Sequence, residues 1–455
     1  MTTFYVEQFG CRATQADGAA IERQLRERGF AAAAQSSAAD VVVLNTCTVT
    51  AAADTQARDA IRKIHAANPA TRIIVTGCYA QRAPEELAAL PGVTYVVGNS
   101  HKPQIPSLLH SISPSLPQRE DPLLLPTPPI LTGDIFATTD VLVAPVLGGE
   151  GNHTRPTLKI QDGCNARCSF CVIPFVRGKS RSLPVATVLA EIRRLAASGF
   201  REIVLSGISL GTYGRDLSPR VEFLDLLRRI LHETAVERLR ISSIEPLDVT
   251  QDLIEFFAAN DCLAPHFHMP LQSASDRILA AMHRWYRAEH YARRIEIIRE
   301  VLPHAAIGAD VLTGFPGESD DDHAATLRFI DERPFTYLHV FSYSSRPGTK
   351  AAALTNHVPG HVIKRRAREL RALADGKSAA FRQSQLGRLL RVLTLHRGAN
   401  DDPAHTPALS ENYLSVMIPE VLPHNRWLTV RATHSDGKHL IGLPQSVAEM
   451  AAIGA

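Results

Sequence analysis

Short apolar runs alternate with amphipathic stretches in residues 1 to about 100 and again from about 150 to 375. Short apolar runs, typical of buried strands, are followed by stretches with apolar residues three and four positions apart, typical of amphipathic helices. The helix predicted at 184–199 places these apolar residues on one face: Val185, Val188, Leu189, Ile192 and Leu195. The repeated strand and helix units predict parallel sheets covered by helices.

Residues 1–101 are predicted to form a first, flavodoxin-like α/β domain, with strands at FYVEQF, DVVVLNT, RIIVTG and VTYVV. Cys11, Cys47 and Cys78 each lie at or just past the end of one of the first three strands. Because the carboxyl ends of parallel strands share one rim, we expect these cysteines to meet in space. A single such thiol is more often a small buried apolar group. The same placement three times favours a site with three thiolate ligands.

The next segment, residues 102–149, is predicted to be a linker because proline is too frequent for a helix or a central strand. Its prolines include Pro103, Pro106, Pro114, Pro117, Pro122, Pro126, Pro128 and Pro129. Such a linker would either let the first domain move toward the next or form an ordered, docked connection.

Residues 150–376 resume the alternation with six predicted strands, at TLKIQD, EIVLSG, RLRISSI, HFHMPL, AIGADVLTG and YLHVFSY. Near-continuous apolar strands separated by helices predict an open (β/α)6 barrel. The loop after the first strand then lies at the rim where barrel active sites form.

That loop carries Cys164, Cys168 and Cys171 in a Cys-x3-Cys-x2-Cys pattern. Three thiolates can hold three irons of a cubic [4Fe-4S] cluster and leave the fourth iron open to a substrate. The alternatives are a zinc knuckle or three core thiols. Zinc sites generally use paired cysteines or histidines with a fourth ligand, and no Cys or His follows Cys171 within the next dozen residues. The triplet therefore favours an iron–sulfur cluster.

Residues 377–446 are predicted to form a small all-β barrel from short strand-like runs separated by polar turns. Its basic and aromatic residues are of the kinds that grip phosphates and stack on bases: Arg382, Arg388, Arg391, Arg397, Tyr413, Arg426, Trp427, Arg431 and Lys438. The alternative for any one of them is a solvated charged surface or a core aromatic.

The composition of the chain changes this picture little. The net charge of +3, from 49 basic and 46 acidic residues, neither demands nor excludes a nucleic-acid partner. The amino terminus lacks the pattern of a secretion signal, and no apolar run reaches the roughly 18 residues of a membrane span. We therefore expect a cytoplasmic protein without a membrane partner, whose seven cysteines are metal ligands or reactive thiols rather than a disulfide framework.

Several stretches of the chain resemble the methylthiotransferase family of radical S-adenosylmethionine (SAM) enzymes over nearly the whole length. They are FGCRATQAD, LNTCTVT, TGCYAQR, DGCNARCSFCVIPFVRGKSRS, LSGISLGTYGRD, RLRISSIEPLDV, HFHMPLQSASDRIL, DVLTGFPGE and FSYSSRPGT. The combination IQDGCN, GISLGTYG and SSIEPL is most similar to the subfamily acting on N6-threonylcarbamoyladenosine. The chain departs from the family pattern at Thr14, at QSASD and at His283 to Tyr286, none of which is a cluster ligand.

The resemblance implies a tRNA-modifying enzyme with two [4Fe-4S] clusters that uses two molecules of SAM per turnover. Cys164, Cys168 and Cys171 would hold the catalytic cluster that cleaves SAM to a 5'-deoxyadenosyl radical. Cys11, Cys47 and Cys78 would hold an auxiliary cluster at which a second SAM methylates a sulfur that is then donated as the methylthio group. The carboxyl-terminal barrel would be an RNA-binding TRAM domain.

The implied reaction is methylthiolation of C2 of N6-threonylcarbamoyladenosine at tRNA position 37. The implied partners are the tRNA anticodon stem-loop and a low-potential electron donor. Three alternatives remain: methylthiolation of N6-isopentenyladenosine in tRNA, methylthiolation of ribosomal protein S12, and a non-catalytic RNA-binding protein with structural zinc in both triplets.

Five polar or small residues at the ends of the predicted barrel strands are the expected SAM contacts: Ser206, Gly207, Ser243, Glu245 and Gln272. Glycine allows close approach of the backbone to a ligand, and Ser243 and Glu245 could bond a ribose hydroxyl. The alternatives are a surface acid for Glu245 and a plain turn for Gly207.

Five further residues are interpreted from their positions. Arg177, Lys179 and Arg181 follow the cysteine loop, where they would neutralise the SAM carboxylate or an RNA phosphate, or form a solvated basic loop. His266 and His268 are expected to have structural roles, with at most one of them facing the barrel interior.

Overall fold

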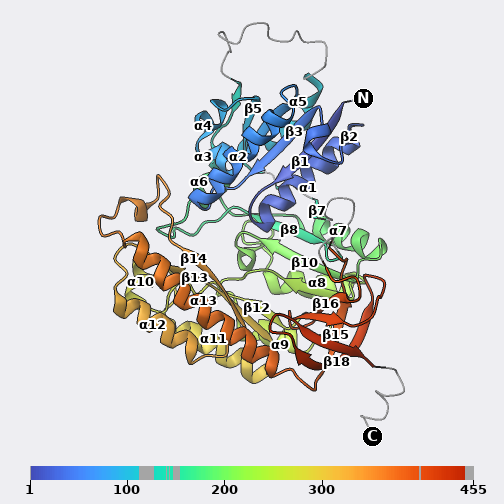
Figure 1. Ribbon diagram of the computed structural model, residues 1–455, viewed down its shortest axis with the longest axis vertical. Helices are drawn as coiled ribbons and strands as arrows, with labels where there is room; N and C mark the ends of the chain where they lie inside the picture. The colour runs from blue at the N-terminus through green and yellow to red at the C-terminus, as the bar shows by residue number, and fades with distance from the viewer. Residues whose placement is uncertain are drawn as a thin grey trace.

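The computed structural model describes residues 2–111, 128–139, 141–142, 144–146, 154–398 and 401–445. Figure 1 shows a sheet covered by helices, then a larger partial barrel, and last a small β-barrel, in chain order. The predicted fold class is confirmed. No helix in the described ranges combines the length and the apolar composition of a membrane span.

The first unit is a six-stranded parallel sheet with the order β2-β1-β3-β4-β5-β6. Its strands are β1 (Thr3–Gln8), β2 (Ala31–Ala32), β3 (Val41–Thr46), β4 (Arg72–Gly77), β5 (Val93–Gly98) and β6 (Ile130–Leu131). Its helices are α1 (Arg12–Glu27), α2 (Ala51–Ala67), α3 (Cys78–Arg82), α4 (Pro84–Ala88) and α5 (Ile105–Ser111). The central strand β3 is buried on both faces, with Val42 and Leu44 in one apolar core and Val41 and Val43 in the other.

The segment predicted to be a linker is partly regular structure. Residues Asn99–Gln104 form a 3-10 turn that continues into α5, whose Ile105 and Leu109 are buried against the first sheet. Pro106 is tolerated because it lies in the first turn of α5, where a backbone N–H has no intrahelical acceptor. The expectation that the prolines exclude a helix is therefore wrong for 105–111, while residues 112–127, 140, 143 and 147–149 of the predicted linker lie outside the described residues.

The second unit contains six parallel strands: β8 (Thr157–Asp162), β10 (Glu202–Gly207), β11 (Arg238–Ile241), β12 (His266–His268), β13 (Ala306–Thr313) and β14 (Tyr337–Ser342). Single bridges from Leu239 to Leu263 and from Ser243 to His268 connect β11 with β12. Within the described ranges β8 and β14 do not pair, so the barrel is open. Two short strands, β7 (Pro145–Val146) and β9 (Arg181–Ser182), pair antiparallel with β8.

The barrel helices are α6 (Ile173–Arg177), α7 (Val185–Ala197), α8 (Phe223–Glu233), α9 (Gln251–Ala258), α10 (Asp276–Ala281), α11 (Ala288–Val301) and α12 (Asp320–Asp331). All five residues of the predicted apolar face of α7 are buried, as expected. These five residues pack with the barrel strands in one large apolar core.

The third unit is a closed barrel with the order β15-β16-β17-β19-β18. Its strands are β15 (Leu389–Thr394), β16 (Thr406–Ser410), β17 (Ser415–Ile418), β18 (Trp427–Ser435) and β19 (Leu440–Pro444). The long helix α13 (Gly360–Gln383) precedes it, so the boundary predicted between residues 376 and 377 falls inside a helix.

This small barrel packs against the amino-terminal ends of the strands of the partial barrel. Arg240 donates hydrogen bonds to Glu202 and to the carbonyl oxygens of Ser410 and Glu411. The guanidinium of Arg238 lies 4.1 Å from the ring centroid of Trp427. Burial alone would raise the pKa of the Glu202 carboxyl, but the neighbouring arginines, Arg240 foremost, lower that pKa to about 2.

Two aromatic residues of the set considered for RNA binding lie at this contact between the barrels. Tyr413 stacks on His266 with ring centroids 4.2 Å apart, and Trp427 donates a 2.6 Å hydrogen bond to Glu237. Of the two interpretations of these residues, an aromatic packed within the protein therefore fits both rings as they lie here. Arg391, Arg426 and Lys438 of the same predicted set are exposed.

Candidate active site

The first cysteine triplet lies at one rim of the first sheet. Cys11 precedes α1 directly after β1, Cys47 follows β3, and Cys78 is the first residue of α3 directly after β4. Gly10 must be small because a Cβ there would lie 2.4 Å from the Cβ of Cys47. Burial raises the pKa of the Cys47 thiol to about 12, and the nearby charges of Cys78 and Cys11 add to that shift. The structure thus brings together three cysteines that are distant in sequence.

The second triplet lies in the loop between β8 and α6, at the rim of the barrel. The loop is held by backbone bonds from Cys164 N to Gly178 O and from Ser169 N to Met282 O. Burial raises the pKa of Cys164 to about 11 and that of Cys171 to about 12, with the charge of Cys168 contributing to each. A metal bound by such thiols would deprotonate them.

The spacing of the sulfur atoms bears on which metal group fits. All six cysteines of the two triplets are free thiols. A single tetrahedral zinc with Zn–S bonds of about 2.3 Å holds its sulfurs about 3.8 Å apart. In the described part of the chain, neither triplet has three ligand atoms within 4.8 Å of one another. Both triplets are therefore wider than one zinc ion requires and suit the larger metal cluster that three thiolates can hold.

Arg284 is a site residue that the sequence did not single out beyond its place in a variant motif. Its guanidinium donates a hydrogen bond to Cys168 Sγ at 3.2 Å and forms an ion pair with Glu245. Burial raises the pKa of the Glu245 carboxyl, and the positive charge of Arg284 opposes that shift. A cation at Cys168 favours the thiolate that a cluster needs.

The expected SAM contacts lie along the carboxyl ends of the barrel strands. Ser206 and Gly207 end β10, and a Cβ on Gly207 would lie 3.0 Å from Gln161 Oε1. Ser243 bridges to β12, and Glu245 follows it. Gln272 has a φ of 61°, and its backbone N–H bonds the carbonyl of Asp310. These residues share one rim, and their contact with SAM stays a prediction.

A cavity of about 230 Å³ lies beside Cys171 of the second triplet and extends to residues that follow Cys47 of the first. Val49 and Thr50, just after Cys47, line one side, and Cys171, Gln272 and Asp310 are among the residues on the other. The walls combine apolar side chains with a few polar groups, which is the usual character of a small-molecule site. The cavity therefore gives a substrate access to groups from both domains.

A buried ion network joins the two cysteine loops. Arg177 pairs with Asp162, two residues before Cys164, at 2.9 Å, and with Asp17 of α1 at 3.0 Å. Lys102 and Lys159 also pair with Asp17. Burial would raise the pKa of the Asp17 carboxyl, but the three cations, Arg177 first, hold it well below its ordinary value.

This network corrects the interpretation of the basic residues after the cysteine loop. Arg177 is 2% exposed and Arg181 is 9% exposed, so neither belongs to a solvated loop. Arg181 donates to the carbonyl oxygens of Arg177 and Lys179. Arg177 is committed to carboxylates of the protein itself, and only Lys179 is exposed as a basic loop residue would be.

A second interdomain contact lies beside Cys47. Arg346, after β14, donates to Asp54 of α2 at 2.6 Å, and Arg82 bonds the same carboxylate at 3.1 Å. Asp54 in turn accepts a hydrogen bond from Thr48, the neighbour of Cys47. The loop that carries Cys47 is thus tied to the partial barrel.

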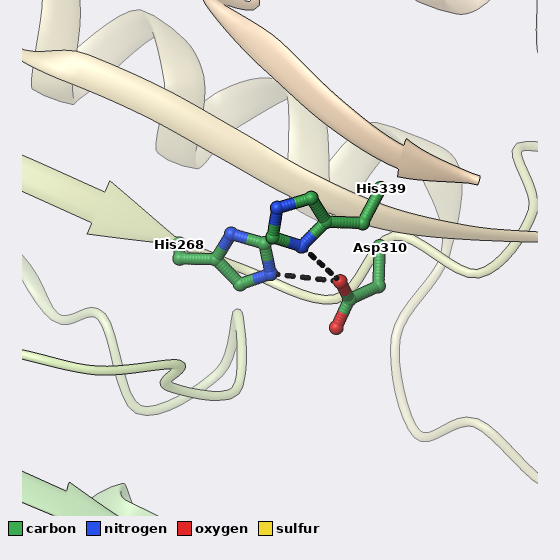
Figure 2. A group of neighbouring side chains, drawn as sticks. All are labelled: His268, Asp310 and His339. Carbon is green, nitrogen blue, oxygen red and sulfur yellow. Dashed lines mark hydrogen bonds and ion pairs between the residues drawn. The ribbon is translucent and has the colours of Figure 1, made fainter. Parts of the chain in front are cut away.

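The expectation that at most one of the two β12 histidines faces the barrel interior is also wrong, while their structural roles stay a prediction. Residues two apart on a strand face the same side, and both His266 and His268 contact the hydroxyl of Tyr337, at 2.7 and 2.9 Å. The His268 ring also approaches Asp310 on β13. Figure 2 shows His268 and His339 converging on one oxygen of the Asp310 carboxylate.

Comparison with known proteins agrees with this architecture. Residues 3–98 match the uncharacterized protein family UPF0004, and residues 158–330 match the radical SAM superfamily. The radical S-adenosylmethionine methyltransferase TsrM from Kitasatospora setae has a similar fold, with a TM-score of 0.54 at 16% identity over 77% of each chain. The barrel with its cysteine loop is thus that of a radical SAM enzyme.

Curated relatives define the family more narrowly. The threonylcarbamoyladenosine tRNA methylthiotransferase MtaB of Aquifex aeolicus is 37% identical over 90% of this chain and 95% of its own length. The tRNA-2-methylthio-N(6)-dimethylallyladenosine synthase of Thermobifida fusca is 35% identical over 89% of this chain and 80% of its own. The chain belongs to the MiaB/MtaB-like family of radical SAM methylthiotransferases, and its small carboxyl-terminal barrel is consistent with a TRAM domain.

Proposed function

We propose that this enzyme methylthiolates C2 of N6-threonylcarbamoyladenosine at position 37 of tRNA. The observation that carries the proposal is one cavity lined by Cys171 of the second triplet and by Val49 and Thr50, which follow Cys47 of the first triplet on a different domain. Relatives named for this nucleoside are 37% and 36% identical to the chain over 90% and 86% of its length.

In this proposal Cys164, Cys168 and Cys171 hold the cluster that binds SAM, while Cys11, Cys47 and Cys78 hold the second. When bound, the two [4Fe-4S] clusters and two SAM molecules per turnover supply the radical chemistry and the methylthio group. The protein keeps the two cluster loops at a fixed separation through the buried network around Asp17. The residues proposed to surround SAM are Ser206, Gly207, Ser243, Glu245 and Gln272.

The partners follow from the same proposal. The anticodon stem-loop of tRNA would bring its nucleoside to the cavity, and a low-potential electron donor would reduce the cluster. Exposed cations of the TRAM-like barrel, such as Arg391, Arg426 and Lys438, would contact RNA phosphates. We further propose that the enzyme works in the cytoplasm.

A second candidate is N6-isopentenyladenosine, because relatives named as dimethylallyladenosine-type synthases are 35% to 37% identical to the chain. The two nucleosides differ chemically in the group on N6, which is a charged threonylcarbamoyl group in one and an apolar isoprenoid in the other.

Mass spectrometry of tRNA nucleosides from a deletion strain tests the choice. We expect loss of the 2-methylthio derivative of threonylcarbamoyladenosine, restored by a plasmid with the wild-type gene but not by one encoding Cys168→Ala. Loss of the isopentenyl derivative alone would select the second candidate. An unchanged nucleoside profile would reject both.

A further inference from the structure

Arg12, at the start of α1, has no carboxylate partner among the described residues, unlike three other arginines near the two cysteine triplets. Arg284 pairs with Glu245, Arg346 with Asp54 and Arg177 with Asp17. Among the described residues, by contrast, no carboxylate lies within ion-pair distance of Arg12. It is exposed, and its guanidinium reaches the hydroxyl of Tyr413 at 3.5 Å. Arg12 directly follows Cys11, so this free positive charge lies beside the first cysteine triplet.

A wall of polar rings leads from Arg12 into the partial barrel. Tyr413 stacks on His266 at 4.2 Å and lies 5.6 Å from the ring of Tyr337. The hydroxyl of Tyr337 contacts both His266 and His268. The electrostatic influence of Arg12 reaches both His266 and Tyr337, which agrees with this placement.

The wall ends at Asp310, which lines the cavity. Its Oδ1 atom lies 2.9 Å from His268 Nε2 and 3.3 Å from His339 Nδ1 (Figure 2). Burial alone would raise the pKa of the Asp310 carboxyl, but hydrogen bonds from the two histidines hold it well below its ordinary value. Asp310 is thus an anion, and its Oδ2 atom has no hydrogen-bond partner among the described side chains.

The two histidines and the carboxylate could also be ligands of a divalent cation, but the hydrogen-bond accounting favours a proton there. Burial lowers the pKa of His266, which is therefore neutral and carries one ring proton. Its Nδ1 is buried without a partner among the described residues. Leaving a lone pair unpaired costs less than leaving an N–H unpaired, so the proton lies on Nε2 and is donated to Tyr337.

The donors of the next two hydrogen bonds in this series follow from that assignment. Tyr337 has a single proton, which it donates to Nδ1 of His268. His268 must carry its own proton on Nε2, where it is donated to Asp310. A proton therefore occupies the position that a metal ion would take, and Asp310 remains an acceptor facing the cavity.

We propose that Arg12 and Asp310 are the two poles of a subsite for the threonylcarbamoyl group, with Arg12 binding its carboxylate and Asp310 accepting a hydrogen bond from an N–H beside the adenine. This inference rests on the proposed function. The threonylcarbamoyl group carries N–H donors near the base and a carboxylate at its far end. Placing the carboxylate at Asp310 would set two anions against each other, so only one orientation is favourable. The isopentenyl group shares the N6–H donor but has no charge for Arg12.

The two poles therefore differ in their expected effect on specificity. Reconstituted full-length enzyme is assayed on two anticodon stem-loops that differ only in threonylcarbamoyl or isopentenyl on N6. Arg12→Gln should lower kcat/KM for the threonylcarbamoyl substrate at least tenfold and leave the isopentenyl substrate within threefold of wild type. Arg12→Lys, which keeps the charge, should recover part of the loss. Asp310→Asn should lower kcat/KM for every stem-loop that wild type uses.

A control variant and two further measurements distinguish a loss of substrate recognition from damage to the clusters. Arg26→Gln changes an exposed arginine of the same helix that pairs with Glu22, and should match wild type on both substrates. Iron content and 5'-deoxyadenosine formation without RNA should be unchanged in the Arg12 and Asp310 variants. A parallel loss of SAM cleavage would place the residue in the SAM site or the cluster loop and overturn the assignment.

The remaining outcomes are distinct. If wild type modifies the threonylcarbamoyl substrate and Arg12→Gln does so equally well, this inference is wrong while the proposed function stands. If wild type modifies only the isopentenyl substrate, or neither, the proposed function fails and the inference falls with it. One equivalent of a non-iron metal in the purified holoenzyme, lost in Asp310→Asn, would make the carboxylate a metal ligand and overturn its role as an acceptor.

Discussion

Arg177 Nη2 lies 3.0 Å from Asp17 Oδ2, and this contact joins the loop of the second cysteine triplet to the helix that begins after Cys11. Both side chains are 2% exposed. Breaking a buried ion pair by removing one partner is costly because the other charge is left without compensation.

Substitution of Asp17 should therefore destabilise the protein strongly. Asp17→Asn leaves Lys102, Lys159 and Arg177 facing one remaining carboxylate, and the expected loss is about 3–5 kcal/mol of unfolding free energy. Chemical denaturation under anaerobic conditions measures it. The matched control is Asp59→Asn, which breaks a half-exposed pair with Arg62 and should cost less than about 1 kcal/mol. Equal small losses in both variants would contradict the importance of the network.

The two triplets should have separable functions. Cys168→Ala should abolish 5'-deoxyadenosine formation, because the SAM-binding cluster would lose a ligand. Cys47→Ala should retain SAM cleavage and lose methylthiolation. Iron analysis and quantification of both products by mass spectrometry check this pair. Cys262→Ala is the control, since Cys262 belongs to neither triplet. Equal SAM cleavage by wild type and the Cys168 variant would refute the assignment.

Arg284 should tune the cluster held by Cys168. Hydrogen bonds to cluster sulfurs and nearby positive charge favour the reduced state, so Arg284→Leu should shift the midpoint potential to more negative values. EPR-monitored redox titration measures the shift, and SAM cleavage should slow in parallel. Arg284→Lys should give a smaller shift because the charge is kept. A potential equal to wild type in the Leu variant would show that the contact with Cys168 has no electronic effect.

The attachment of the small barrel should weaken in acid. The pKa of Glu202 is lowered from 4.5 to about 2, so its contribution to stability is complete above pH 4.5 and is lost as the pH falls toward 2. The full contribution is on the order of 3 kcal/mol by linkage.

Comparison of wild type with Glu202→Gln tests this prediction. The difference in unfolding free energy should be largest near pH 7 and should shrink below pH 4.5, with Trp427 fluorescence reporting on the contact. Glu222→Gln, at an exposed pair with Arg220, serves as the control. A difference that is independent of pH would exclude ionisation of Glu202 as the cause.

Much of the fold follows from local patterns in the sequence. The continuous apolar run of β3 and the apolar face of α7 predict which residues are buried, and the structure confirms them. The position of each cysteine after a strand predicts the meeting of Cys11, Cys47 and Cys78. These features depend on residues close in sequence and on one general property of parallel sheets.

The parts that sequence did not predict depend on contacts between distant segments. Nothing local distinguishes Arg177, which pairs with Asp17, from Lys179, which is exposed. Tyr413 and Trp427 are residue types that are common on RNA-binding surfaces. In the structure, however, they pack against His266 and Arg238 of another domain. Pairings of this kind depend on how domains dock, and a single sequence holds no periodic signal for them.

The connection between the first two domains carries a short strand at each end of its described part, β6 and β7. β6 is hydrogen-bonded to the first sheet and β7 to the second, so the stretch between them is anchored on each side. Asp17 and Asp54 pair with Arg177 and Arg346 across the same contact, so the first domain is fastened to the partial barrel at several points. A reaction that uses both cysteine triplets would then bring the nucleoside and SAM to the docked domains, rather than carry one domain to the other.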